Sequence, residues 1–165
     1  MIESQKSKLF LILIIIFSLC IIFIFYLVSR FGGAGGVVFD YAEGMQSFNS
    51  KKIVDLYFED MLKESYESKA EMIEEFDKLF NDMRESSLKI TKFDVDNNYK
   101  LYKASEYDYQ KEILVKYYGI DENYISEIRG YVVTFYCVSG KEKKEVESNL
   151  IVAKIKKNWY LISTE

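Results

Sequence analysis

An uninterrupted apolar run near the N-terminus constrains this chain more than any other feature. Residues 9–28 carry no charged side chain, and seventeen of these twenty residues are Leu, Ile, Phe or Val. At about 1.5 Å of rise per residue, a helix of this length reaches about 30 Å, which is the thickness of the hydrocarbon core of a bilayer. The insertion free energy of those side chains sums to about −5 to −10 kcal/mol as an upper bound. We therefore expect residues 9–28 to form a transmembrane helix.

Two other kinds of N-terminal segment compete with a permanent anchor. A cleavable signal peptide has an apolar region of about 7 to 15 residues, shorter than this run. The alternative to a permanent anchor is that the chain is cleaved among the small residues 33–36. A lipoprotein signal needs a small residue before a cysteine at the end of the run, whereas Cys20 follows Leu19 in its middle. The length of the run favours an uncleaved signal anchor.

The charges that flank the run predict its orientation. Lys6, Lys8 and the terminal amine precede it, and Arg30 is the one cation that follows it before Lys51. Because positively charged flanks stay in the cytoplasm, residues 1–8 are expected to form a cytoplasmic tail of a single-pass protein in the cell membrane. The C-terminal part then lies outside. Residues 29–36 include the glycine-rich FGGAGG and are interpreted as a flexible joint.

The remaining residues, 37–165, are expected to form one extracytoplasmic domain. Their number is that of an ordinary single domain with its own core. Residues 31–165 carry 19 Lys and Arg against 25 Asp and Glu, a net charge of −6, which argues against nucleic acid as a partner. Cys20 lies in the apolar run and Cys137 in an apolar alternating segment, so no internal disulfide is expected.

Apolar residues recur at helical spacing in the first part of this domain. Val38, Tyr41, Met45 and Phe48 predict one helix, and the repeat from Ile53 to Leu62 predicts a second that begins at Asn49 or Ser50. The S-x-x-E sequence at residues 68–71 is a capping box that opens a third helix. Its apolar stripe is formed by Met72, Ile73, Phe76, Leu79, Phe80 and Met83.

The period changes from helix to strand after Ser86. Residues 87–96 predict a strand, residues 105–118 a short helix stopped by Gly119, and YVVTFYCV a central strand with two apolar faces. Residues 145–156 and 159–163 complete an antiparallel meander. The predicted fold class is therefore α+β, with an N-terminal transmembrane helix followed by helices packed on a curved antiparallel sheet.

The chain closes on KIKKNWYLIS, in which Trp159 and Tyr160 follow a basic hairpin turn. This ending and the order of elements over residues 37–163 resemble the nuclear-transport-factor-like, or cystatin-like, cone domain. Behind a single transmembrane anchor, the arrangement is similar to that of uncharacterised exported proteins of low-GC Gram-positive bacteria. The resemblance implies a cone-like sheet used for ligand binding, for a few small enzymes or for protein contacts.

Alternate residues of adjacent strands converge in such a cone. Tyr131, Phe135, Trp159 and Leu161 are the predicted lining of an interior that admits a small apolar ligand. The alternative is that these four side chains fill the core.

No catalytic residue, metal ligand or cofactor site is predicted. Enzymes of the resembling family use a His or an Asp-based acid/base pair, and this chain has no histidine. The segment that starts at Asp94 begins like a calcium loop, but its sixth residue is Tyr99 and its twelfth is Ser105. Asp94 and Asp96 are close in sequence, which alone defines no site. Cys137 has no cation beside it in sequence and is interpreted as a small buried residue.

Charge is distributed unevenly over the domain. Residues 55–85 hold eleven acidic and four basic side chains, interpreted as a solvated face or as a docking face for a basic partner. Six lysines form an opposite pole, which fits either protection of a sheet edge or contact with anionic lipid: Lys141, Lys143, Lys144, Lys154, Lys156 and Lys157.

These observations predict a non-enzymatic, membrane-anchored interaction module on the outer side of the membrane. Its expected partners are the lipid bilayer, through residues 9–28, and other envelope proteins of a secretion, conjugation or other envelope assembly. The alternative function is a sensor or carrier that binds a small apolar ligand in the cone. An enzyme is the least favoured hypothesis, since it needs carboxylates and tyrosines that converge in a pocket.

Overall fold

The computed structural model describes residues 16–21, 33–66, 68–96, 100–101 and 104–164. The chain divides into two compact units, Met1–Gly32 and Gly33–Glu165. In the first unit residues 16–21 are helical with exposed side chains. Among the described residues no helix is both long enough and apolar enough to cross a membrane. The rest of the predicted span 9–28, namely residues 9–15 and 22–28, lies outside the described residues.

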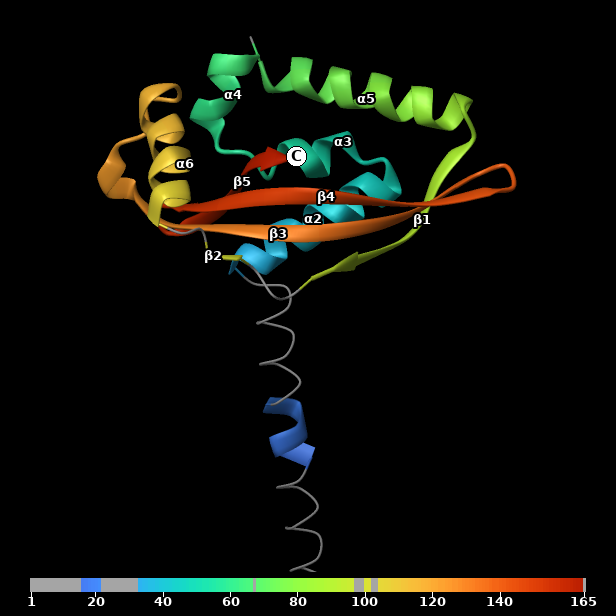
Figure 1. Ribbon diagram of the computed structural model, residues 1–165, viewed down its shortest axis with the longest axis horizontal. Helices are drawn as coiled ribbons and strands as arrows, with labels where there is room; N and C mark the ends of the chain where they lie inside the picture. Colours follow the sequence, from blue (N-terminus) through green and yellow to red (C-terminus); the bar gives the residue numbers. More distant parts are fainter. Residues whose placement is uncertain (1–15, 22–32, 67, 97–99, 102–103, 165) are drawn as a thin grey trace, which may run out of the picture. The chain divides into compact units, whose positions relative to one another are not determined.

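The second unit is an α+β domain, as predicted (Figure 1). Its antiparallel sheet has the strand order β1-β3-β4-β5, and the short β2 pairs with β3. The strands are β1 (Leu88–Val95), β2 (Lys100–Leu101), β3 (Ile125–Ser139), β4 (Glu142–Ile155) and β5 (Asn158–Thr164). The helices are α2 (Gly33–Ser47), α3 (Ser50–Val54), α4 (Glu59–Ser65), α5 (Lys69–Glu85), α6 (Ala104–Lys116) and the 3₁₀ turn η1 (Glu122–Tyr124).

Helix α2 begins earlier than the sequence pattern predicted. Residues 33–36, assigned to the flexible joint 29–36, are its first turn. Ala34 and Gly36 are buried there, and a Cβ added to Gly33 would lie 3.5 Å from Nε1 of Trp159. Small residues let the helix lie close to the sheet, and the burial offsets the conformational cost of helical glycine. Helix α2 contacts β1, β3, β4 and β5.

The predicted second helix is divided into α3 and α4. Asn49 caps α3 as predicted, because its Oδ1 accepts a hydrogen bond from the backbone N–H of Lys52 at 3.0 Å. The helix then stops at Val54, since Leu56 turns its carbonyl to the backbone N–H of Leu161, 2.9 Å away. Pairing with the edge of β5 therefore prevails over a helical repeat that continues in the sequence.

Helix α5 confirms the predicted capping box. Ser68 Oγ accepts a hydrogen bond from the backbone N–H of Glu71 at 3.2 Å. From the apolar stripe, Met72 and Phe80 are buried, whereas Leu79 is 44% exposed. The ring of Phe80 lies 5.2 Å from that of Phe48 and 6.0 Å from that of Phe76, so one aromatic cluster holds α5 to the turn between α2 and α3.

The main core lies on one face of the sheet, here called the inner face. On β3 it takes the alternating residues Tyr131, Val133, Phe135 and Cys137, all buried. Helices α2, α3 and α5 all contribute buried residues to the same cluster, and Phe80 is the largest of its fully buried side chains. The prediction that the leading helices cover the apolar face of the sheet holds for α2, α3 and α5.

The opposite, outer face is covered at one end only. Met61 of α4 and Leu114 of α6 pack there against Ile128 of β3 and against Ile151 and Ile155 of β4. Figure 1 shows α4 and α6 at the end of the sheet opposite to the turn that joins β3 to β4. Both faces of the central strand are thus apolar at this end. At the other end, α4 and α6 do not cover the outer face.

Tyr57 lies where two of the hydrophobic clusters meet. Because its phenol is buried there, we expect the domain to lose stability at alkaline pH. Burial raises the pKa of Tyr57, and it also raises the pKa of Tyr41, partly offset by a hydrogen bond with Thr164. The folded state therefore retains phenolic protons that the unfolded chain loses above about pH 10. The free energy of unfolding should be insensitive to these groups below about pH 10 and should fall as the pH rises beyond it.

The measurement compares the parent chain with Tyr57→Phe at pH 8 and pH 11, using fluorescence of the single tryptophan during urea unfolding. Tyr57→Phe should lose less stability between the two pH values than the parent does. Tyr109→Phe is the control, because Tyr109 is 63% exposed, and it should behave like the parent. Equal losses in all three chains would contradict this role for Tyr57.

Candidate functional site

The structure brings the four predicted pocket residues together in the inner-face core. Tyr131, Phe135 and Leu161 are buried, and Trp159 is half-buried against the same cluster. Helix α2 contributes Val38 and Tyr41 to this cluster, and its Gly33 lies beside Trp159. Neither of the two cavities described below is lined by any of these four side chains.

Arg129 joins this group, although the sequence did not single it out. Its guanidinium carbon lies 4.9 Å from the centroid of the Trp159 ring, and its Nη2 lies 2.5 Å from Oε1 of Glu127. Burial lowers the pKa of Arg129, but hydrogen bonds with Tyr131 and Glu127 outweigh that effect and raise it. The i, i+2 spacing of residues 127, 129 and 131 on one strand was the available signal.

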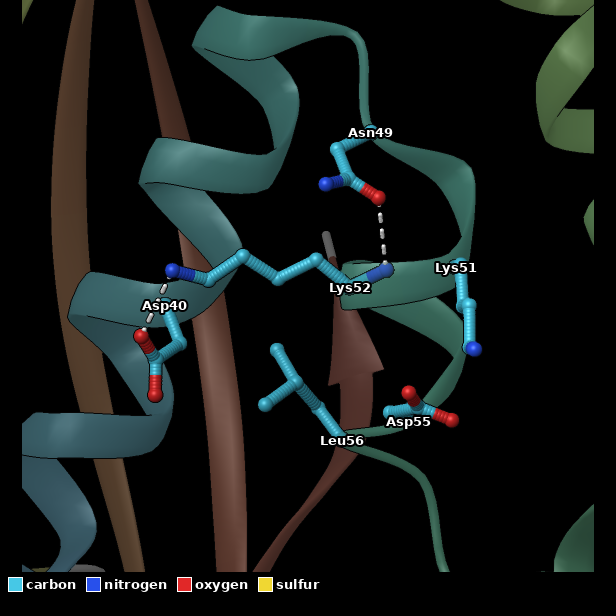
Figure 2. Close-up of a pocket in the computed structure, with 6 residues that line it drawn as sticks. All are labelled: Asp40, Asn49, Lys51, Lys52, Asp55 and Leu56. Carbon is cyan, nitrogen blue, oxygen red and sulfur yellow. Dashed lines mark hydrogen bonds and ion pairs between the residues drawn. The ribbon is translucent and has the colours of Figure 1, made fainter.

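The first cavity, of about 430 Å³, lies beside α2 and α3 (Figure 2). Lys52 reaches across it from α3, and its Nζ lies 2.9 Å from Oδ1 of Asp40 on α2. Lys52 also forms an ion pair with Glu43. The other lining residues are Asn49, Lys51, Asp55 and Leu56.

The charges of this cavity are used to hold the fold together. Burial lowers the pKa of Lys52, but its hydrogen bonds to Glu43 and Asp40 prevail and raise it, so the side chain stays protonated. Asp55 forms an ion pair with Lys69 at the start of α5. Because these contacts join α2, α3 and α5, we interpret the cavity as a structural junction rather than a binding site.

The second cavity, of about 490 Å³, lies on the outer face at the end of the sheet that α4 and α6 leave uncovered. It spans three adjacent strands. Its lining comprises Thr91, Lys92, Tyr136, Cys137, Val138, Lys143, Lys144 and Glu145. We call the outer-face residues here the uncovered surface: Lys92 and Asp94 on β1, Val132, Thr134, Tyr136 and Val138 on β3, and Lys143, Glu145 and Glu147 on β4.

A polar cluster occupies the middle of the uncovered surface. Lys92 Nζ lies 2.7 Å from Oδ2 of Asp94 and 5.0 Å from the centroid of the Tyr136 ring. The hydrogen bond from Lys92 lowers the pKa of Asp94, and the hydrogen bond to Asp94 raises the pKa of Tyr136. An aromatic ring flanked by both signs of charge is suited to contact with a polar protein surface.

Strand β4 adds an unpaired edge beside this surface. Its pairing with β3 runs from Ile155 to Glu142, whereas its pairing with β5 starts only at Leu150. Residues 142–147, here called the free edge, are all exposed, and among the described residues they have a strand partner on one side only. The outer edge of β5 is instead covered by Leu56 and Tyr57.

The other sequence-predicted groups are found apart from one another. Lys141 and Lys143 are at the β3–β4 hairpin as expected, while Lys156 and Lys157 are at the next turn, at the far end of β4. Cys137 is 8% exposed, and burial raises its pKa, so its thiol is not activated. No group of three or more potential metal ligands lies together in the part of the chain that the structure describes.

Comparison of the chain with family models, with curated proteins and with solved structures finds no match.

Proposed function

We propose that this chain is a non-enzymatic interaction module, anchored in the cell membrane by residues 9–28, with its α+β domain on the outer side. Its domain would be a cone-like member of the nuclear-transport-factor-like, or cystatin-like, type. The observation that carries this proposal is the uneven cover of the sheet. Helices α4 and α6 protect one end of the outer face, whereas the β1–β3–β4 end presents the uncovered surface and the free edge together.

The chemistry of this surface favours a protein partner. It combines an aromatic ring, half-buried aliphatic side chains and charges of both signs, which is the composition of a polar protein interface. An open sheet edge beside it offers backbone hydrogen bonds, the basis of strand addition. Lys92 and Asp94 are paired with each other, and no histidine exists in the chain to complete an acid/base set.

Photo-cross-linking in cells tests the proposal. A photoreactive phenylalanine analogue replaces Tyr136 on the uncovered surface or, as a control, Tyr109, which is 63% exposed on α6. The full chain is produced in the cells that naturally carry it. We expect cross-linked products at Tyr136 at several times the yield at Tyr109. Equal yields at both positions, or none at Tyr136, would contradict the proposal.

The same cells test the anchor and the orientation. After fractionation the chain should be recovered with the membranes, and protease added to spheroplasts should digest the domain. Removal of residues 9–28 should release the chain from the membrane fraction. A mature chain that begins near Gly36, or a domain that protease cannot reach in intact spheroplasts, would contradict this part of the proposal.

A further inference from the structure

We infer that the free edge pairs with the free edge of a second copy of this chain. The two β4 strands would run antiparallel about a two-fold axis at Lys144, which joins two sheets into one. This inference rests on the proposed function and names the partner of its interaction surface.

The backbone of the free edge is available for such pairing. On β3, the carbonyl of Val132 accepts a hydrogen bond from the backbone N–H of Asp96, and the carbonyl of Tyr136 accepts one from Oγ1 of Thr91. The backbone N–H and C=O groups of the even-numbered residues in this stretch therefore point toward β1. The odd-numbered residues then point toward β4, and Cys137 and Phe135 face Lys144 and Val146. Alternate residues of β4, at positions 143, 145 and 147, therefore direct their N–H and C=O groups away from β3.

The charges of residues 141–147, KEKKEVE, select one register. With the axis at Lys144, Lys143 lies opposite Glu145 and Lys141 opposite Glu147, and the symmetry repeats each pair. This register gives four pairs of opposite charge, and its one contact between like charges is Lys144 with Lys144. An axis at Glu145 gives two such pairs and a Glu145–Glu145 contact, and an axis at Val146 sets Glu145 against Glu147 twice.

The neighbouring registers are less compatible with the hairpin. An axis at Lys143 also gives four opposite-charge pairs, but its ladder covers only residues 141–145, whereas the ladder about Lys144 covers residues 141–147, because both end where the hairpin turn begins. If one copy of β4 were shifted by one residue against the other, backbone groups that point outward in one copy would lie opposite backbone groups that point toward β3 in the other. The register at Lys144 therefore combines complementary charge with a regular ladder.

Charged edges normally protect a sheet from pairing with foreign strands. The free edge keeps that protection, since an uncharged strand would leave its lysines and glutamates without partners. A copy of itself in the antiparallel register instead neutralises them, which makes the edge selective for its own sequence. Anchoring in one membrane would further raise the local concentration of copies.

Cysteine cross-linking tests the register in the full chain. Cys20→Ser and Cys137→Ala first remove the two native thiols. Single cysteines are then placed at Lys144, Lys143, Glu145 or Val146, all exposed, and the membranes are oxidised mildly. On the axis, position 144 faces itself in a non-hydrogen-bonded pair with Cα atoms about 4.5 Å apart, within the range of a disulfide.

We expect disulfide-linked dimers with Lys144→Cys at several times the yield of the other three positions. A maximum at another position, or no dimer at Lys144→Cys, would overturn the inference. All four substitutions are at exposed positions of one strand, so we expect each variant to keep the fold. The tryptophan fluorescence of each variant checks this.

Charge reversal tests the same pairing without a covalent bond. Lys143→Glu would set two pairs of like charge against each other and should weaken dimerisation on the order of tenfold in detergent, measured by sedimentation. The double variant Lys143→Glu/Glu145→Lys restores opposite charges and should restore the dimer. Lys157→Glu, at an exposed turn position at the far end of β4, is the matched control and should have no effect.

The two proposals fail in distinguishable ways. If Lys143→Glu and Lys157→Glu behave alike, or the double variant does not recover, the self-pairing is wrong. If cross-links from Tyr136 then still capture other envelope proteins, the proposed function stands with a different partner. If Tyr136 gives no cross-links at all and the chain is monomeric, both proposals fall together.

Discussion

Replacement of Phe80 by alanine is expected to lower the free energy of unfolding by about 3 to 5 kcal/mol, the usual cost of deleting a fully buried phenylalanine. Phe80 is 0% exposed and is the largest of the fully buried side chains. It contacts the rings of Phe48 and Phe76 and is the residue by which α5 reaches the inner-face core. Its loss leaves a cavity lined by two aromatic rings that cannot close without moving α5.

Leu79→Ala on the same helix is the matched control. Leu79 is 44% exposed, so its truncation should cost less than about 1 kcal/mol. Both values come from urea unfolding of the full chain in detergent, followed by the fluorescence of Trp159. If the two substitutions cost the same, α5 does not pack on the sheet as described.

Much of the domain follows from local sequence signals. The capping box at Ser68 and the apolar stripe after it specify α5, because both signals act within one or two turns of helix. The β-branched and aromatic stretch around Phe135 specifies a central strand, and in the structure it pairs with β1 on one side and with β4 on the other. Asn49 likewise specifies the start of α3.

Long-range contacts decide the features that the sequence pattern did not predict. The break between α3 and α4 depends on Leu161, more than 100 residues away in the chain, whose N–H captures the carbonyl of Leu56. Helix α2 starts at Gly33, which lies beside Trp159 of β5. Neither interaction has a signature within the segment that it alters, so periodicity alone extends or shortens these helices wrongly.

The candidate site was missed for the same reason. The pattern of β3 predicts apolar residues on both faces, but only the placement of α4 and α6 decides which part of the outer face is covered. Tyr136 and Val138 thus read as core from the sequence and are half-buried in the fold. Conversely, the sequence leaves Tyr131, Phe135, Trp159 and Leu161 open as pocket lining or as filled core, and the structure places them in or against the inner-face cluster.

The one-sided cover of this part of the sheet has a large and testable consequence. Val133 and Val138 are on the same strand, but Val133 is 0% exposed on the inner face and Val138 is half-buried on the uncovered surface. Val133→Asp places a carboxylate in the core without a partner, and we expect a loss of about 3 to 5 kcal/mol or outright unfolding. Val138→Asp should cost less than about 1 kcal/mol, because its neighbours across the strands are Lys89 and Lys143.

The pH dependence of the two variants gives a second, independent difference. Burial would raise the pKa of the carboxyl introduced by Val133→Asp above its unfolded value, so the folded state would bind the proton more tightly. The stability of Val133→Asp should therefore increase as the pH falls from 7.5 to 5. The carboxylate of Val138→Asp lies between lysines, which lower its pKa, so the stability of this variant relative to the parent should stay the same between pH 7.5 and pH 5.

Urea unfolding of both variants at the two pH values, with the parent as reference, measures these effects. Equal destabilisation of Val133→Asp and Val138→Asp would mean that the outer face is covered at this end after all. The uncovered surface and the free edge would then be unavailable to a partner, and both the interaction module and its self-pairing would lose their physical basis. A large difference between the two valines would show that this end of the outer face is exposed, which is the condition that the proposed contacts require.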